Sequence, residues 1–372
     1  SSMIAFHLPK KDFQGFHIVA SHSDSPTYRI KEQPEMSVEK HYTKLNIERY
    51  GGMIPETWFD RPLSVAGRII IEENGQIKDQ LVNIDRDLMI IPNLAIHMSR
   101  SSNESKQLNP QKDLLPLCGG NLTKDGFEEM IAKESGVEKE DILAYDLFLY
   151  NRMRGTTLGI NEEFVAAPKL DDLECAYSSI EGILNAKLSK DYVTVCAVFD
   201  NEEVGSGTKQ GAGSTFFPEV LKRISYLCEK NEEEYYMAVA DSFMLSADNA
   251  HAVHPNYQDK TDPTNRPYIN EGIVLKYNAS QKYTTDANSA ALVKYLCKKE
   301  KIKCQVFFNR SDMLGGSTLG NILTGQVSIK AADIGLPQLS MHSTYETAGC
   351  KDLDDMITLM GSFYELGKEV QI

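Results

Sequence analysis

Acidic and histidine side chains recur at five places in the chain, each next to the expected end of a strand or helix. Imidazole and carboxylate groups without cysteine are ligands that suit Zn²⁺, Co²⁺ or Mn²⁺. A single ion would not use all of these ligands. Two ions could share one carboxylate as a bridge and hold a water between them. We therefore predict a two-metal hydrolytic site from His22-Ser23-Asp24, Leu170-Asp171-Asp172, Asn201-Glu202-Glu203, Ala247-Asp248 and Met341-His342-Ser343.

Two of these motifs suggest a division of labour. Side chains two apart on a strand share a face, so Asp24 can accept the second N–H of the His22 imidazole and fix its tautomer. Glu202 and Glu203 follow a buried strand, where two like charges are costly unless a cation compensates at least one. We expect one glutamate to bind metal and the other to act as general base on a metal-bound water.

Each motif also has an ordinary structural explanation. A lone His22 or His342 is more often structural or hydrogen-bonded than a ligand, and paired glutamates are common on solvated surfaces. Asp171-Asp172 precedes an apolar helical stripe and could simply cap that helix. The joint occurrence of all five motifs at predicted element ends favours the metal site, although spacing alone does not name the reaction.

The hydrophobic pattern predicts the elements that must position these residues. Strands are expected at 4–8 and 15–20, and residues 26–165 form a mostly β region with a hairpin turning at Glu73-Asn74-Gly75. After Pro168 helices alternate with buried strands, which indicates an α/β fold with helices on both faces of a largely parallel sheet. Further expected elements are helices at 123–135, 172–188 and 353–366, and strands at 142–150, 192–199, 236–240 and 304–308.

At these motifs the sequence closely resembles the aspartyl aminopeptidase family of di-zinc metallopeptidases, peptidase family eighteen, in its bacterial type. The resemblance covers nearly the whole chain and implies a phosphorylase/hydrolase-like, three-layer catalytic domain with a mixed sheet. That domain would comprise 1–25 and 166–372, with an inserted β-rich dimerisation domain at 26–165. The matching segments are 22–26, 168–173, 199–206, 245–257 and 340–343.

Carried over residue by residue, the resemblance implies two zinc ions per subunit, with cobalt or manganese as possible substitutes. Asp171 would bridge the ions, and the peptide bond after it is often cis in related enzymes. Glu202 would be the general base, and Asp24 would support His22. The terminal ligands would be His22 and Asp248 for one zinc, and Glu203 and His342 for the other.

The resemblance also implies substrate-binding residues and an assembly. Family members form dimers and hollow tetrahedral dodecamers, and His97 in segment 91–98 would reach a neighbouring subunit's active site. Its alternative is a hairpin histidine with a local hydrogen bond. Lys276 would lie beside an acidic first residue of the substrate, although a surface strand lysine is the commoner interpretation. Asp312 and Gly316 belong to a loop, 311–318, that matches the family's substrate loop in part, and its Met313 and Leu314 favour a broader or apolar preference.

We therefore predict a metalloaminopeptidase that hydrolyses the N-terminal residue of peptides, with a possible preference for acidic first residues. A related deacylase or carboxypeptidase is the first alternative, and it would need a basic clamp for a free carboxylate. A metal-binding scaffold without catalysis is the second. Such a scaffold would be expected to have lost its base, whereas Glu202 is present.

The bulk composition is consistent with a globular enzyme. The chain has 372 residues, which favours two domains, and its net charge of −14 argues against a nucleic-acid partner. An apolar run of the roughly 20 residues needed to span a bilayer is not found, so a membrane is not expected as a partner. The seven cysteines lack CxxC spacing and favour a reducing cytoplasm. The chain opens without an initiator methionine, and an upstream segment is expected.

Overall fold

The computed structural model describes residues 1–9, 12–100, 107–122 and 125–369. The chain divides into two compact units. The first unit comprises Ser1–Ser25, Thr156–Met341 and Glu346–Ile372, and the second comprises Pro26–Gly155 and His342–Tyr345. The second unit is therefore mostly an insertion within the sequence of the first.

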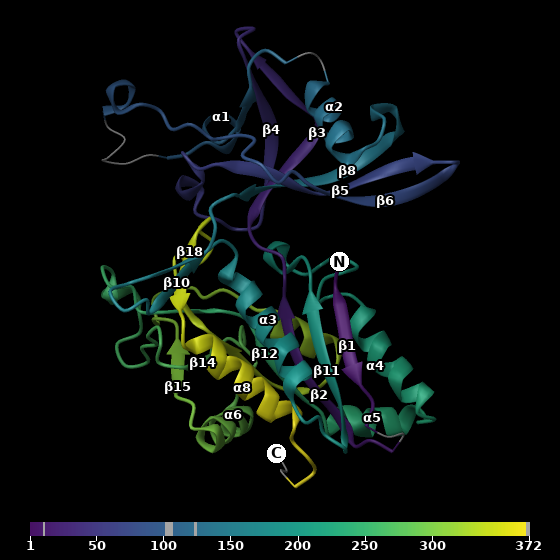
Figure 1. The fold of residues 1–372 in the computed structure, drawn as a ribbon. Helices are drawn as coiled ribbons and strands as arrows, with labels where there is room; N and C mark the ends of the chain where they lie inside the picture. The colour runs from purple at the N-terminus through teal and green to yellow at the C-terminus, as the bar shows by residue number, and fades with distance from the viewer. Residues whose placement is uncertain (10–11, 101–106, 123–124, 370–372) are drawn as a thin grey trace. The chain divides into compact units, whose positions relative to one another are not determined.

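A mixed seven-stranded sheet forms the centre of the described part of the first unit (Figure 1). Its strand order is β1-β11-β2-β12-β16-β14-β15. The neighbours from β11 to β16 run parallel, as do β14 and β15, whereas β1 and β11, and β14 and β16, are antiparallel. The strands are β1 Met3–His7, β2 Gly15–His22, β11 Tyr192–Phe199, β12 Phe243–Ala247, β14 Ile273–Tyr277, β15 Cys304–Phe308 and β16 Lys330–Gly335.

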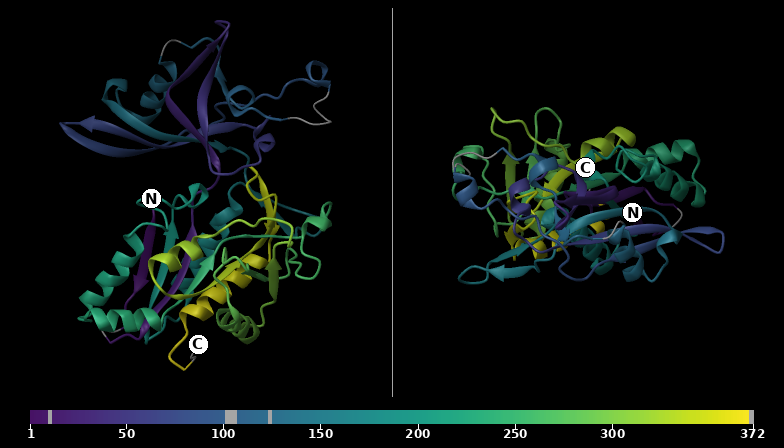
Figure 2. Two further views of the ribbon diagram at one scale, coloured as in Figure 1. Left: turned by 180° about the vertical axis from the view of Figure 1, so that it is seen from behind. Right: turned by 90° about the horizontal axis from the view of Figure 1, so that it is seen from above.

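Helices cover both faces of this sheet, because each face carries apolar side chains that must be shielded from water. One face packs against α3 Leu170–Asn185, α6 Ala287–Glu300 and α8 Asp352–Tyr364. The other face packs against α4 Phe216–Leu227, α5 Glu232–Ala240 and α7 Leu319–Gln326, which can be followed from behind in Figure 2. The three-layer α/β architecture predicted from the sequence is confirmed.

A smaller sheet in the first unit brings together segments that flank the predicted site. Its order is β13-β17-β18-β10-β9, and the antiparallel pairing of β10 with β18 places Ala167 opposite Glu346. The strands are β9 Thr156–Leu158, β10 Phe164–Ala167, β13 Ala250–His251, β17 Pro337–Leu339 and β18 Glu346–Gly349, and two 3-10 turns complete the unit at η5 Glu202–Val204 and η6 Gln258–Lys260.

The second unit is built on a sheet with the order β6-β5-β8-β3-β4-β7, which packs its apolar side chains into a core of its own. Tyr28 and Trp58 meet edge to face in that core, with their ring centroids 4.9 Å apart. The strands are β3 Thr27–Val38, β4 Tyr42–Tyr50, β5 Leu63–Glu73, β6 Gln76–Asn83, β7 Leu117–Gly119 and β8 Ile142–Asn151; the helical elements are η1 Pro55–Trp58, η2 Ile96–Met98, α1 Pro110–Asp113, α2 Gly126–Ser135 and η4 Lys139–Asp141.

The elements expected at 15–20, 192–199 and 304–308 are present as β2, β11 and β15. The hairpin between β5 and β6 turns at Asn74 and Gly75, whose φ values of 54° and 73° suit the tight turn predicted there. The strand expected at 236–240 is wrong, because this segment is the second half of α5. Of the helix expected at 123–135, residues 123–124 lie outside the described residues and the helix begins at Gly126.

In the described residues, no helix combines the length and the apolar character needed to cross a membrane. All seven cysteines are free thiols, and four of them are buried as small apolar side chains.

Candidate metal centre and active site

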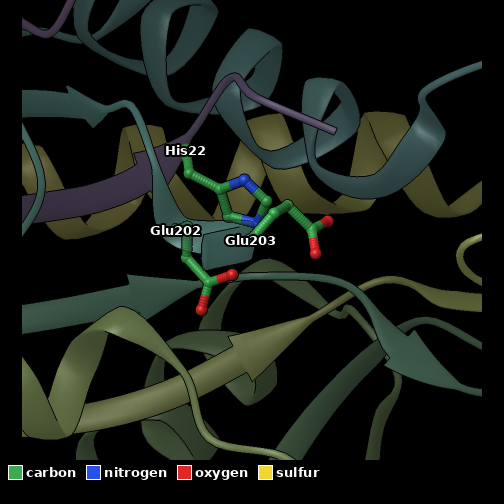
Figure 3. Close-up of side chains that lie close together, drawn as sticks. All are labelled: His22, Glu202 and Glu203. Atoms are coloured by element: carbon green, nitrogen blue, oxygen red, sulfur yellow. The ribbon is translucent and has the colours of Figure 1, made fainter. Parts of the chain in front are cut away.

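Three neighbouring parallel strands deliver acidic and histidine side chains to one edge of the central sheet. His22 is the last residue of β2 and pairs with Phe199, the last residue of β11. Asp248 follows the end of β12 directly, and Glu202 and Glu203 lie in η5 just beyond β11. Because parallel strands end at the same edge, residues distant in sequence meet there. Figure 3 shows the two glutamate side chains around the His22 imidazole.

His22, Asp171 and Asp248 form a buried group of potential metal ligands. One ligand atom from each lies within 4.8 Å of the others, and His22 Nε2 is 3.6 Å from Asp171 Oδ1. His22 with Glu202 and Glu203 forms a second group of the same kind. An imidazole nitrogen and several carboxylate oxygens at these separations match the donor set that Zn²⁺ takes.

The other ring nitrogen of His22 is occupied by Asp24. Nδ1 lies 3.1 Å from the Asp24 carbonyl oxygen and 3.4 Å from its carboxylate oxygen Oδ1. With the proton on Nδ1, the ring donates to Asp24 and leaves the Nε2 lone pair available to a metal. The residue that the sequence predicts as the imidazole's partner thus lies beside it, with the hydrogen bond going to its carbonyl group.

Asp24 has a second contact that the sequence analysis missed. Its carboxylate accepts the backbone N–H groups of Glu202 and Glu203, each at 3.1 Å. These two donors belong to the start of η5, whose N–H groups have no partner within so short a turn. Asp24 therefore fixes the turn that carries the glutamate pair as well as the imidazole.

Asp171 and Asp172 lie at the start of α3, joined by a cis peptide bond. Both aspartates have non-helical backbone angles, and the Asp172 carboxylate accepts a hydrogen bond from His22 on β2. Asp171 N–H donates to Glu346 Oε2 at 3.0 Å, and His22 N–H donates to Asp172 Oδ2 at 3.2 Å. Asp172 was predicted only as part of its motif, without a role of its own, and Glu346 was not predicted. The sequence offers no signal for Glu346, because its contact depends on the pairing of β18 with β10.

The buried carboxylic acids of the site lie close together, and this shifts their pKa values. Burial, with the nearby Asp248, raises the pKa of Glu202 to about 7, and burial, with Asp171, raises the pKa of Glu203 to about 10. Burial also raises the pKa of Asp248. Burial alone would lower the pKa of His22, but Asp172 and the other carboxylates hold it well above its ordinary value. A divalent cation would stabilise all these carboxylates in their charged form, so the residues fit a metal.

Comparison with known proteins gives the family. Residues 1–364 match the family described as "Aminopeptidase I zinc metalloprotease (M18)". The chain belongs to the M18 aminopeptidase family. It is 46% identical over 377 residues to a "Probable M18 family aminopeptidase 2" of Clostridium novyi, which covers 98% of this chain and 86% of the relative. It is thus a zinc-dependent aminopeptidase.

Solved structures agree with this assignment. The structure of "the Ape4 and Nbr1 complex" matches 98% of this aminopeptidase and 74% of the other chain, with 36% identity and a TM-score of 0.93. The structure of the yeast "mApe1 dodecamer" matches 98% of this chain and 83% of the other, with 28% identity and a TM-score of 0.83. The fold of the aminopeptidase is therefore that of M18 enzymes.

The residues predicted to bind substrate in the first unit differ in exposure. Lys276 on β14 is 2% exposed, so the alternative of a surface lysine is wrong. Its Nζ donates to the carbonyl oxygens of Asp248 and Asn249. Asp312 is exposed and forms an ion pair with Arg310 at 2.8 Å, which lowers its pKa to about 2. Gly316 is also exposed, and a Cβ built on it would meet nothing within 4 Å.

The two remaining predicted residues belong to the second unit. His342 begins the segment His342–Tyr345, and its carbonyl oxygen accepts the backbone N–H of Ile54 at 3.1 Å. His97 lies in η2 and is exposed. The ligand role of His342 and the role of His97 toward a neighbouring subunit stay predictions.

Proposed function

We propose that this M18 aminopeptidase removes single residues from the free N-termini of peptides at a two-zinc site. The observation that carries the proposal is the group His22, Asp171 and Asp248, whose ligand atoms lie within 4.8 Å of one another. Glu202 and Glu203 lie next to this group, so the same edge of the sheet offers both metal ligands and a carboxylate to move protons.

The ligand set that we propose follows the resemblance residue by residue. Asp171 would be shared by the two ions, with His22 and Asp248 as further ligands of one ion and Glu203 and His342 as further ligands of the other. Support comes from the nitrogen and oxygen donors of the first group, and from the raised pKa values of Asp248 and Glu203, since a cation offsets the repulsion among these acids.

In this proposal Glu202 is the general base. Bound zinc supplies Lewis acidity, which lowers the pKa of water and polarises the scissile carbonyl group. The Glu202 carboxylate takes the proton of the attacking water and later gives it to the nitrogen of the leaving amine. Asp24 keeps Glu202 in place through the peptide N–H contact, and it keeps the His22 ring oriented. The free α-amine of the substrate is received by the neighbouring acidic groups.

We also propose that the enzyme associates into dimers and a tetrahedral dodecamer through its second unit, with His97 completing a neighbour's site. The relative described as a dodecamer supports this assembly. The second unit also carries exposed apolar side chains that a partner subunit could cover. They are Ile77, Leu81, Leu94, Ile96 and Met98. The seven free cysteines are consistent with a cytoplasmic location.

Substrate preference is the finer part of the proposal. The resemblance at 272–276 favours acidic first residues, whereas the exposed Met313 and Leu314 in the loop 311–318 favour apolar ones. The deacylase or carboxypeptidase alternative differs from an aminopeptidase in what it does with a blocked N-terminus, because only an aminopeptidase needs the free α-amine.

The test is release of free amino acid from peptides that differ only in their first residue, each with and without N-terminal acetylation. Zinc, cobalt or manganese is added to metal-free enzyme. We expect cleavage of free N-termini only, and the ranking of first residues gives the preference. Turnover of acetylated peptides would favour the deacylase or carboxypeptidase, and no turnover with any metal would favour the scaffold.

A further inference from the structure

Lys276 is a cation buried in the middle of the central sheet. It lies on β14, which runs between β15 and β16, and only 2% of the residue is exposed. Burying an ammonium group is unfavourable unless its charge and its N–H donors are matched. The contacts that match them therefore indicate what the side chain does.

These contacts converge on Asp248 and the residue after it. Nζ donates to the Asp248 carbonyl oxygen at 2.7 Å and to the Asn249 carbonyl oxygen at 3.3 Å. The Asp248 carboxylate oxygen Oδ2 is 3.7 Å from the same nitrogen, within ion-pair distance. The ring of Tyr283 lies on another side, with its centroid 5.2 Å from Nζ. An ammonium group has three N–H donors, and two of them go to these carbonyl oxygens, while the carboxylate oxygen matches its charge.

A second buried acidic residue lies opposite Lys276 on the neighbouring strand. Asp333 on β16 pairs with Lys276 in the antiparallel register, and its fully buried carboxylate accepts hydrogen bonds from Thr318 and Thr284. Lys276 thus has two buried acidic residues, Asp248 and Asp333, as neighbours. Only 2% of the residue is exposed to meet a substrate carboxylate, and two of its three N–H donors are already engaged.

We propose that Lys276 is a positioning residue that holds the backbone and carboxylate of Asp248 for metal binding. The inference rests on the proposed function, because it takes Asp248 as a zinc ligand. Asp248 shares its surroundings with His22, Asp171 and the glutamate pair, where acids repel one another. The positive charge of Lys276 offsets that repulsion, and its hydrogen bonds fix the chain at the end of β12.

The test uses the full chain with Lys276→Met, which keeps the length of the side chain and removes its charge and donors. Zinc affinity is measured by competition with a chromophoric chelator. Steady-state kinetics are measured on two peptides that begin with Glu or Gln and are otherwise identical. We expect one zinc to bind 10- to 100-fold more weakly. In zinc-saturated enzyme, kcat should fall equally for the Glu peptide and the Gln peptide. The ratio of the KM values of these two peptides should be unchanged.

Two further variants separate charge from hydrogen bonding and control for the region. Lys276→Gln retains an N–H donor, so it should recover part of the zinc affinity lost in Lys276→Met. Lys282→Met alters an exposed lysine in the segment between β14 and α6 and should leave zinc affinity unchanged. If circular dichroism shows that neither Lys276 variant folds, Tyr283→Leu replaces them, since it removes the ring beside Nζ and should weaken zinc binding in the same direction.

The inference would be overturned if Lys276→Met bound zinc with wild-type affinity, or if Tyr283→Leu did so where it replaces that variant. Wild-type zinc affinity together with a raised KM for the Glu peptide alone would assign Lys276 to the substrate instead. Failure of the proposed function is distinct, because wild-type enzyme would then hydrolyse neither peptide. The comparison of zinc affinities would still report on Lys276 in that case.

Discussion

Several residues at the site organise the predicted ligands without being ligands themselves. Asp24 contacts the His22 ring and both peptide groups of the glutamate pair. Asp172 accepts the His22 backbone N–H, and Glu346 accepts that of Asp171. Partners of this kind orient ligand side chains, and their removal commonly weakens metal affinity or activity by about 10- to 100-fold.

Glu202→Gln tests the proposed general base. The amide cannot take a proton from water, so kcat should fall by at least about 10²- to 10⁴-fold, while both zinc ions are retained. Zinc content by atomic absorption and turnover of the best peptide measure the two effects. Glu219→Gln, on the exposed side of α4, is the matched control. An active Glu202→Gln enzyme would remove Glu202 from this role.

Asp24→Asn tests the support beneath the glutamate pair. The amide has one oxygen in place of two, so one of the peptide N–H groups of Glu202 and Glu203 loses its acceptor. We expect zinc to bind about 10- to 100-fold more weakly, together with a lower kcat. The exposed Asp79→Asn serves as control. Unchanged zinc affinity would mean that the turn keeps its shape without this carboxylate.

The sequence predicts which residue types gather at the site better than it predicts which neighbouring residues hold them in position. His22 and Glu202 lie at or just beyond the ends of strands that their apolar runs predict, so their meeting at one edge can be expected, whereas the strand before Asp248, β12, was not predicted. Asp172 carries a weak signal from its place beside Asp171. Glu346 carries none, since its contact with Asp171 depends on the pairing of two short strands that are far apart in sequence.

Among the elements, α5 shows where a hydrophobic run misleads. Residues 236–240 are mostly apolar and could equally be a buried strand or part of a helix, because a run this short lacks a clear period. The deciding feature is local. Asn231 accepts the N–H of Glu234 and the Glu234 side chain accepts that of Asn231, which is a capping box at the start of a helix. Asn and Glu three residues apart were a signal available in the sequence.

The strand β2 carries a second histidine that makes the first unit sensitive to acid. His17 is buried, and its ring stacks on Tyr192 with the centroids 4.0 Å apart. Among the described residues Nδ1 has no hydrogen-bond partner. Burial lowers the pKa of His17 from 6.5 to about 3. Between these values the unfolded chain binds a proton that the folded chain does not, so stability is lost as the pH falls below 6.5.

His17→Phe should therefore flatten the acid side of the stability profile. At pH 5 the wild-type enzyme should lose about 2 kcal/mol through this histidine relative to pH 8, because one pKa unit corresponds to about 1.4 kcal/mol. Urea unfolding of both proteins at the two pH values measures the difference. His41→Phe, at an exposed histidine, should keep the wild-type profile. An equally steep profile in His17→Phe would assign the acid sensitivity to other groups.

At the scale of the whole molecule, the proposed role of His97 means that a subunit is fully active only when a neighbouring subunit supplies this side chain. If His97 serves a neighbour, His97→Ala should lower activity without loss of zinc, and Glu202→Gln subunits should be inactive although their His97 is intact. Mixed assemblies should then regain activity, because Glu202→Gln subunits supply His97 to the sites of His97→Ala subunits. Co-expression of the two variants with different affinity tags, followed by tandem purification and a kinetic assay, measures this.

The matched control pairs Glu202→Gln with Glu203→Gln. Both substitutions damage the subunit's own site, so mixing should restore nothing. Mixed His97→Ala and Glu202→Gln assemblies with no more activity than the sum of the separate variants would reject the trans role. Wild-type kinetics in His97→Ala alone would reject it as well.

The ends of β2, β11 and β12 meet at one edge, yet these strands are far apart in the order of synthesis. His22 leaves the ribosome early, whereas Asp248, Lys276 and Glu346 follow much later. A growing chain that has made β2 and β11 but not β12 therefore lacks a ligand that completes the His22 and Asp171 group. On the proposed ligand set, the group of His22, Asp171 and Asp248 can therefore take its metal only after β12 has been synthesised and has joined the sheet.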